Sequence, residues 1–148
     1  MKTLENWLNN GWLVKHRTSR DEIAELFQVA DRDLIDCRSE GLSPHWRLAI
    51  AYNAALRLAA AALAASGYRP AREAHHYRVI QSLRHTIRLD PSTVAQFDAF
   101  RKKRNLGGYE RAWMVSDQEA DEMIALARDL RRTVEEWFLT TFPDLICN

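Results

Sequence analysis

The pattern of apolar and polar residues has the period of an α-helix along most of the chain. Ser19, followed three residues later by Glu22, has the form of a capping box, and apolar residues recur after it at helical spacing until about Gly41. A second helical stretch, from about Pro44 to Ser66, is rich in alanine and poor in polar residues. Its length and low polarity predict the central helix of the fold.

Three more helices are predicted downstream. The third spans residues 74–88, where apolar side chains again recur at helical spacing. The fourth opens at Asp90 and Pro91, because proline suits the first turn of a helix. A second capping box, Ser116 with Glu119, opens the fifth helix. Helices joined by short connections are typical of an antiparallel bundle.

The chain of 148 residues is long enough for one domain, residues 1–148, whose core needs neither disulfides nor a metal. Strand-forming residues are sparse, whereas Ala, Leu, Glu and Arg are abundant, which favours an all-α fold. Residues 1–18 are predicted to form an N-terminal arm, 68–70 a connector, and 140–148 a C-terminal tail draped over the helices. The prediction is an up-and-down antiparallel bundle of four to five helices.

Composition indicates a cytoplasmic protein. Cys37 and Cys147 form neither a metal-ligand cluster nor a disulfide framework. The first five residues lack the apolar core of a signal peptide. The apolar stretch at 48–65 is mostly alanine and carries Asn53 and Arg57, which favours a buried helix over a membrane span. We therefore expect no association with a membrane.

Charge is unevenly distributed although the net charge is only +1. Residues 67–111 hold ten Lys and Arg against four Asp and Glu, a balance of +6. Residues 112–148 hold three against eight, a balance of −5. The basic middle of the chain suits a phosphate ligand, and equally it suits pairing with the acidic final helix.

The fourth helix ends in the most distinctive stretch of the chain. Its last turn carries four consecutive cations, Arg101, Lys102, Lys103 and Arg104. Asn105 follows, then Gly107 and Gly108, which are expected to stop the helix, and then Tyr109. Side chains at this end are expected to converge on one site. A solvated helix end, where cations complement the helix dipole, is the structural alternative.

Histidines and aromatic residues add weaker signals. His75, His76 and His85 lack the spacing of metal ligands on one helix, so no metal site is predicted, and His76 is a candidate phosphate contact. Trp113 lies beside Arg111 in the sequence, an arrangement that suits base stacking, although packing is the usual role of tryptophan. The chain has no phosphate loop or dinucleotide-binding fingerprint, and no cofactor is predicted.

Over residues 20–140 the sequence resembles HEPN-domain proteins (higher eukaryote and prokaryote nucleotide-binding). Three features carry the resemblance in order: an Ala-Tyr-Asn-Ala-Ala run at 51–55 with a Gly-Tyr-Arg-Pro turn at 67–70, a His-His-Tyr segment at 75–77, and Arg104-Asn105 followed by Tyr109. The last of these resembles the family's motif of Arg, four to six residues, then His.

The resemblance implies a bundle that forms a homodimer, with two copies of the motif facing one cleft. Active relatives are metal-independent endoribonucleases, frequently toxins of toxin–antitoxin pairs or defence proteins. Others partner minimal nucleotidyltransferases or bind nucleotides without catalysis. Some are silenced by adenylylation of a tyrosine two residues beyond the motif histidine, a position held here by Arg111.

The sequence departs from the family motif where catalysis depends on it, because Tyr109 stands in place of the histidine. Metal-free RNA cleavage needs a group that exchanges protons near neutral pH. Histidine has an ordinary pKa of about 6.5 and tyrosine of about 10. Arg104 can still bind a phosphate by a bidentate contact, and Asn105 can orient the phosphate or a ribose. Binding therefore survives this substitution more easily than catalysis.

Three functions follow, in order of preference. The first is a nucleotide- or RNA-binding regulatory module, with catalysis weak or lost. The second is a metal-independent endoribonuclease in which Arg104 acts with Tyr109 or a nearby histidine. The third is a helical protein-interaction module. The predicted catalytic set, if the protein is active, is Arg104, Asn105 and Tyr109. The predicted binding set is Arg101, Lys102, Lys103, Arg104, His76 and Arg111.

Overall fold

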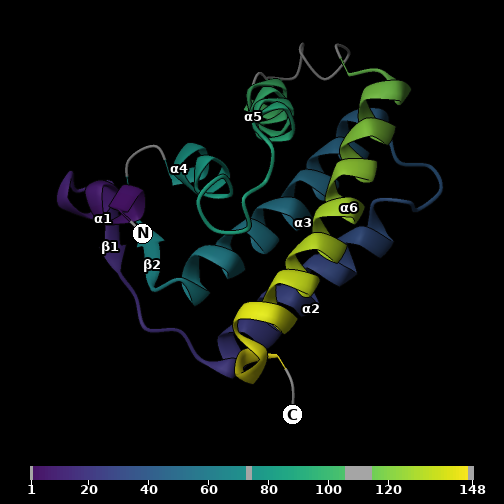
Figure 1. Ribbon diagram of the computed structural model, residues 1–148. Helices are drawn as coiled ribbons and strands as arrows, with labels where there is room; N and C mark the ends of the chain where they lie inside the picture. The colour runs from purple at the N-terminus through teal and green to yellow at the C-terminus, as the bar shows by residue number, and fades with distance from the viewer. Residues whose placement is uncertain (1, 73–74, 106–114, 147–148) are drawn as a thin grey trace.

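The computed structural model describes residues 2–72, 75–105 and 115–146, and most of them are helical (Figure 1). The helices are α1 (Lys2–Asn9), α2 (Arg20–Asp36), α3 (Pro44–Ala65), α4 (His75–Ser82), α5 (Pro91–Asn105), α6 (Asp117–Thr141) and the short 3₁₀ helix η2 (Pro143–Leu145). The strands are β1 (Leu13–Lys15) and β2 (Tyr68–Pro70). The fold is thus predominantly α, as predicted, with one small sheet.

The small sheet was not predicted. β1 and β2 pair antiparallel, so that Leu13 lies opposite Pro70 and Lys15 opposite Tyr68. Each strand has three residues, too few for alternation of apolar and polar side chains to be visible in the sequence. The predicted arm and connector are therefore tied to each other, and the side chain of Leu13 is buried at this junction.

Helix α3 lies at the centre, packed between α2 and α6 (Figure 1). Arg47, near the start of α3, pairs with Asp117 at 2.8 Å and with Asp121 at 2.7 Å, both near the start of α6. Phe27 of α2 packs against Phe138, near the end of α6. Helix α2 is therefore antiparallel to its neighbours, as predicted. The central helix α3 and the final helix α6 run in the same direction, so the predicted up-and-down order is wrong for this pair. The chain between these two helices crosses the bundle through α4 and α5.

The prediction of a buried central helix is confirmed for α3. Ser43 caps its first turn by accepting a hydrogen bond from the backbone N–H of Trp46 at 3.4 Å. Its alanines let neighbouring helices approach closely, and Tyr52 is its largest fully buried side chain. Of the described helices, this one alone is long and apolar enough to cross a membrane, and 72% of its most apolar window is buried inside the protein.

Helix α4 is shorter than the predicted helix over 74–88. The Ser82 hydroxyl donates to the Val79 carbonyl at 2.6 Å, and the Thr86 hydroxyl donates to the Ser82 carbonyl at 3.3 Å. Hydroxyl side chains of this kind compete with backbone hydrogen bonding in helices. Past Ser82 the chain turns, and Arg88 adopts a left-handed φ of 59° before the next helix begins. Apolar spacing alone did not reveal this stop.

Helix α5 begins at the predicted Pro91, where the Asp90 carboxylate accepts a hydrogen bond from the backbone N–H of Thr93 at 3.0 Å. Its inward face is buried, except that Ala99, predicted to be among the apolar positions, is exposed. The helix ends at Asn105. The glycines predicted to stop it lie outside the described residues.

Both predicted serine caps are present. Ser116 and Glu119 form a full capping box at the start of α6, with each side chain bonded to the backbone of the other. At α2 the Ser19 hydroxyl accepts from the backbone N–H of Glu22 at 3.1 Å. The Glu22 carboxylate is bonded to His16 at 2.7 Å, so it holds the end of the N-terminal arm.

The C-terminal tail packs on the bundle, as predicted. Phe142 contacts Trp137 with ring centroids 5.3 Å apart, and Leu145 and Ile146 pack against the core. The Arg20 side chain donates to the Asp144 carbonyl at 2.9 Å. The tail is thereby joined to the start of α2.

Candidate anion-binding site

The structure describes only part of the predicted site. The described side chains are those of Arg101, Lys102, Lys103, Arg104 and His76. Tyr109, Arg111 and the side chain of Asn105 lie outside the described residues. The question is therefore which of the described cations share a face, and what surrounds them.

Arg104 lies over the middle of the central helix. Its guanidinium carbon is 5.2 Å from the ring centroid of Tyr52, and the Tyr52 ring is fully buried beneath it. The Tyr52 hydroxyl is 3.3 Å from Nδ1 of His76. Three helices, α5, α3 and α4, thus bring an arginine, a phenol and an imidazole together. His76, a member of the predicted binding set, therefore lies near Arg104, and its role in binding stays a prediction.

The phenol at the centre of this group stays protonated at neutral pH. Burial raises the pKa of Tyr52 to about 12, although the nearby charges of Arg104 and Arg101 act in the opposite direction. A protonated hydroxyl in a buried position needs a hydrogen-bond acceptor. Nδ1 of His76 lies at hydrogen-bonding distance, so it can serve as that acceptor.

His76 is neutral at the same pH. Burial lowers its pKa below 6.5, and the neighbouring charges of His75, Arg104 and Arg101 lower it further. A neutral imidazole that accepts a hydrogen bond at Nδ1 carries its proton on Nε2. The direction of this hydrogen bond depends on the His76 tautomer: when Tyr52 donates to Nδ1, His76 offers an N–H donor at Nε2.

Arg101 and Lys102 share one carboxylate. Arg101 Nε donates to Asp98 Oδ1 at 2.7 Å, and Lys102 Nζ lies 3.8 Å from Asp98 Oδ2. Asp98 is only 8% exposed, so the pairing is partly shielded from water. Two positive charges against one negative charge leave this end of α5 with an excess of positive charge. The guanidinium of Arg101 also lies 5.5 Å from the ring centroid of Tyr77.

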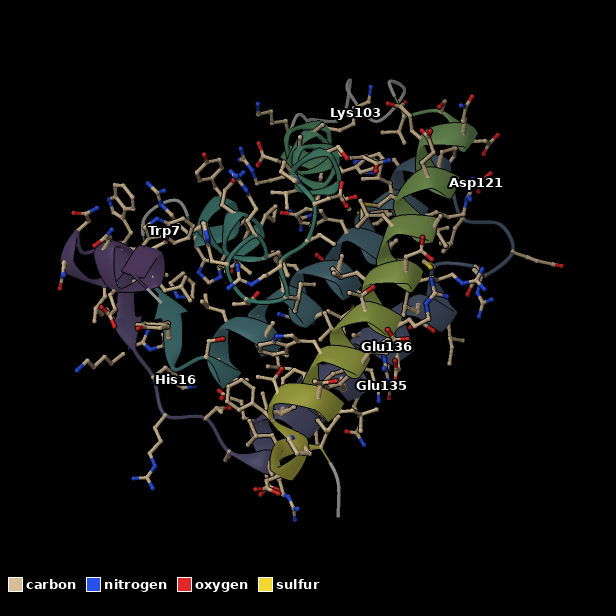
Figure 2. The ribbon with its side chains drawn as sticks, viewed as in Figure 1. Trp7, His16, Lys103, Asp121, Glu135 and Glu136 are labelled. Carbon is tan, nitrogen blue, oxygen red and sulfur yellow. The ribbon has the colours of Figure 1, made fainter. Side chains whose placement is uncertain are left out.

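Lys103 belongs to a different contact. It forms an ion pair with Glu119 at 3.0 Å, across from the end of α5 to the start of α6 (Figure 2). The predicted pairing of the basic middle of the chain with the acidic final helix is therefore present at Lys103, whereas the phosphate ligand stays a prediction. Lys103 pairs with the acidic final helix, whereas Arg104 and Arg101 lie with the aromatic residues of α3 and α4.

Sequence reasoning missed three members of the site. Tyr52 and Tyr77 were noted only as parts of the segments that carry the HEPN resemblance, and Asp98 was not noted. The available signal was a hydroxyl in the middle of an apolar helix, because such a group must find a polar partner. The identity of that partner depends on how α4 crosses α3, which the sequence does not give.

Within 2–72, 75–105 and 115–146, no three His, Cys, Asp or Glu side chains are grouped as a metal site requires. A cavity of about 360 Å³ lies between α2, α6 and the C-terminal segment, away from the predicted site. Apolar side chains such as Phe27 and Leu139 line it together with Arg20 and Arg131.

Comparison of the chain with protein-family models, with curated proteins and with solved structures gives no match.

Proposed function

We propose that this protein is a HEPN-like module that binds RNA or a nucleotide through its phosphate, with catalysis weak or lost. The observation that carries the proposal is the group formed by Arg104, Tyr52 and His76, with Arg101 beside it. In the HEPN interpretation the chain forms a homodimer and can act with a minimal nucleotidyltransferase. The resemblance supports those two features and the contacts described above do not bear on them.

The chemistry of the group suits a phosphate. Guanidinium groups recognise phosphate oxygens by paired, charge-assisted hydrogen bonds. The positive charges that lower the pKa of His76 also stabilise an anion bound beside it. An imidazole N–H at Nε2 is a suitable neutral donor to a phosphate oxygen. Tyr52 supports this arrangement by fixing which nitrogen of His76 carries the proton.

The same details favour binding over catalysis. Cleavage of RNA without a metal needs a base that accepts the 2′-OH proton. Tyr109 is a poor base at pH 7 because phenols have an ordinary pKa of about 10. His76 is neutral, but the Tyr52 hydrogen bond directs its proton to Nε2. Neither group is set up as the proton acceptor.

The test is fluorescence anisotropy with a labelled single-stranded RNA of mixed sequence and with a labelled nucleotide. Arg104→Ala is expected to weaken binding about tenfold or more, because a charge-assisted contact contributes roughly 1.5–3 kcal/mol. Arg132→Ala is the matched control, since Arg132 lies on α6 and its side chain is 69% exposed. Equal affinity of the Arg104→Ala variant and the wild type would contradict the proposal.

A second candidate, the metal-independent endoribonuclease, is favoured by one observation: a neutral histidine lies in the same group as Arg104. If the Tyr52 hydroxyl instead accepts from Nδ1–H, Nε2 of His76 becomes a base. Cleavage of an RNA pool in EDTA distinguishes the two, using wild type, Arg104→Ala, His76→Gln and Tyr109→Phe. Cleavage that Arg104→Ala and His76→Gln both abolish would establish the enzyme and assign the base.

The protein-interaction module remains the third reading of the chain. A wild-type protein that neither binds nor cleaves RNA, and binds no nucleotide, would leave it as the best account. The genomic neighbourhood would then be informative, because an adjacent minimal nucleotidyltransferase would identify a partner.

A further inference from the structure

A row of alternating cationic and aromatic side chains leads away from the proposed phosphate site. We call it the α4 ladder, and its members are Arg101, Tyr77, Arg78, Trp12 and Trp7. It runs from the end of α5 across α4 to the N-terminal arm. In Figure 1 these three elements lie next to one another, on the side of the molecule away from α2 and α6.

The spacing of the ladder is close throughout. Tyr77 lies between two guanidinium groups, at 5.5 Å from Arg101 and 5.3 Å from Arg78. The Arg78 guanidinium carbon is 3.8 Å from the ring centroid of Trp12 and 5.8 Å from that of Trp7. Figure 2 shows Trp7 between α1 and α4, where it also meets His85. Each of these distances between a guanidinium carbon and a ring centroid lies within the range of a cation–π contact.

Two properties make the ladder suitable as a binding surface. Trp12 is 38% exposed although it is one of the largest apolar side chains, and Tyr77 and Arg78 are both partly exposed. Of the ion pairs formed within the described residues, none includes Arg78. Its contacts are with ring faces, which add no negative charge, so its positive charge can attract an anion.

We infer that the α4 ladder is a track for single-stranded RNA that continues from the proposed phosphate site. The inference rests on the proposed function, since it extends the same ligand. Proteins bind single strands by stacking bases on aromatic rings and by tracking the backbone with cations. Here Arg78 and Arg101 attract the phosphates, and the exposed part of Trp12 that Arg78 leaves uncovered stacks with a base. A duplex fits poorly, because its base faces are already stacked on each other.

The inference gives the N-terminal arm a role. Trp12 directly precedes β1, whose pairing with β2 holds the arm in place. Trp7 meets Trp12 edge-on, with ring centroids 6.3 Å apart. The arm is therefore part of the RNA-binding surface, although the resemblance to HEPN proteins begins only after it.

The test compares a labelled RNA of about ten nucleotides, within the range of known single-strand sites, with a labelled dinucleotide. Trp12→Leu is expected to weaken binding of the longer RNA by about five- to a hundredfold, the effect of losing one base stack. Binding of the dinucleotide at Arg104 should stay unchanged. Trp46→Leu is the matched control, because Trp46 is 58% exposed and lies at the start of α3.

Further variants distinguish the loss of an RNA contact from a loss of folded structure. Arg78→Gln should reduce the slope of log affinity against log salt by about 0.7, the value for one phosphate on a single strand. Arg132→Gln, on α6, should leave that slope unchanged. Trp12→Phe keeps an aromatic face and is expected to recover most of the affinity that Trp12→Leu loses. Circular dichroism would verify that each variant is folded.

The outcomes separate the two proposals. If Arg104→Ala weakens binding of both ligands while the ladder variants bind like wild type, the track is wrong and the phosphate site stands. If the wild type binds neither ligand, the proposed function itself fails. A duplex of the same sequence that binds as tightly as the single strand would also overturn the track.

Discussion

The two halves of the molecule hold their arginines in different ways. In the bundle of α2, α3 and α6, arginines are paired with carboxylates. Arg47 binds Asp117 and Asp121, and Arg131 binds Asp31 at 2.7 Å and Glu135 at 3.2 Å. The pairs with Asp117, Asp121 and Asp31 join neighbouring helices, whereas the Arg131–Glu135 pair lies within α6.

In the half formed by the arm, the small sheet, α4 and α5, Arg101 pairs with Asp98, whereas two other arginines lie on aromatic rings. Arg78 is over Trp12, and Arg104 is over Tyr52. A ring attracts a cation through its quadrupole, by about 0.5–2 kcal/mol, but adds no negative charge. The half formed by the arm, the small sheet, α4 and α5 therefore keeps an excess of positive charge.

The largest effect should come from the bundle core. Phe138→Ala removes a fully buried ring that contacts Phe27 and Trp137, and should lower the free energy of unfolding by about 3–5 kcal/mol. Urea denaturation measures this loss. Leu139→Ala, at a neighbouring position that is 50% exposed, is the control and should change stability by less than about 0.5 kcal/mol. Equal losses for the two would contradict the assigned burial.

Removing the hydroxyl of Tyr52 should have a smaller effect on stability. Tyr52→Phe keeps the ring beneath Arg104 and deletes only the bond to His76, so a loss of about 0.5–1.5 kcal/mol is expected. The same variant tests the proposed proton position, because His76 Nε2 is no longer directed to be the donor. Weaker binding of phosphate ligands would support that position, and new cleavage activity would argue for the endoribonuclease.

The sequence predicted the bundle half better than the other half. The limits of α3 and the serine caps follow from local rules. Ser43 and Ser116 each cap the first turn of their own helix, and the alanine content of α3 favours a helix along its whole length. The group around Tyr52 depends on α4 crossing α3 and on α5 ending above both. His76 and Arg104, which follow Tyr52 by 24 and 52 positions in the sequence, meet Tyr52 there. No local sequence pattern predicts contacts between residues so far apart in the chain.

The free energy of unfolding should depend on pH through two histidines of the half formed by the arm, the small sheet, α4 and α5. Burial lowers the pKa of His76, with His75 and Arg104 adding to the shift, and burial with Arg84 and Arg88 lowers the pKa of His85. Below about pH 6.5 these two histidines bind protons in the unfolded chain more readily than in the folded protein. Their contribution to stability is therefore complete above pH 6.5 and is lost as pH falls from that value through the lowered pKa values of the folded protein.

Urea denaturation at pH 7.5 and at pH 5.5 measures this dependence. The wild type should be less stable at the lower pH, and the double variant His76→Gln/His85→Gln should lose less stability between the two conditions. An unchanged pH dependence in the double variant would assign the effect to other groups.

The smallest effect should belong to the contact that joins the two halves, the ion pair of Lys103 with Glu119. Its lysine side chain is 25% exposed and its glutamate 32%, so a coupling of about 0.2–1 kcal/mol is expected from a double-mutant cycle. Glu119→Gln suits the cycle because glutamine can keep the capping bond to the Ser116 backbone. Because Lys103 is turned to α6, Lys103→Gln should weaken RNA binding less than Arg101→Gln does. Equal losses of affinity would place Lys103 on the binding face and remove the distinction between the two cations.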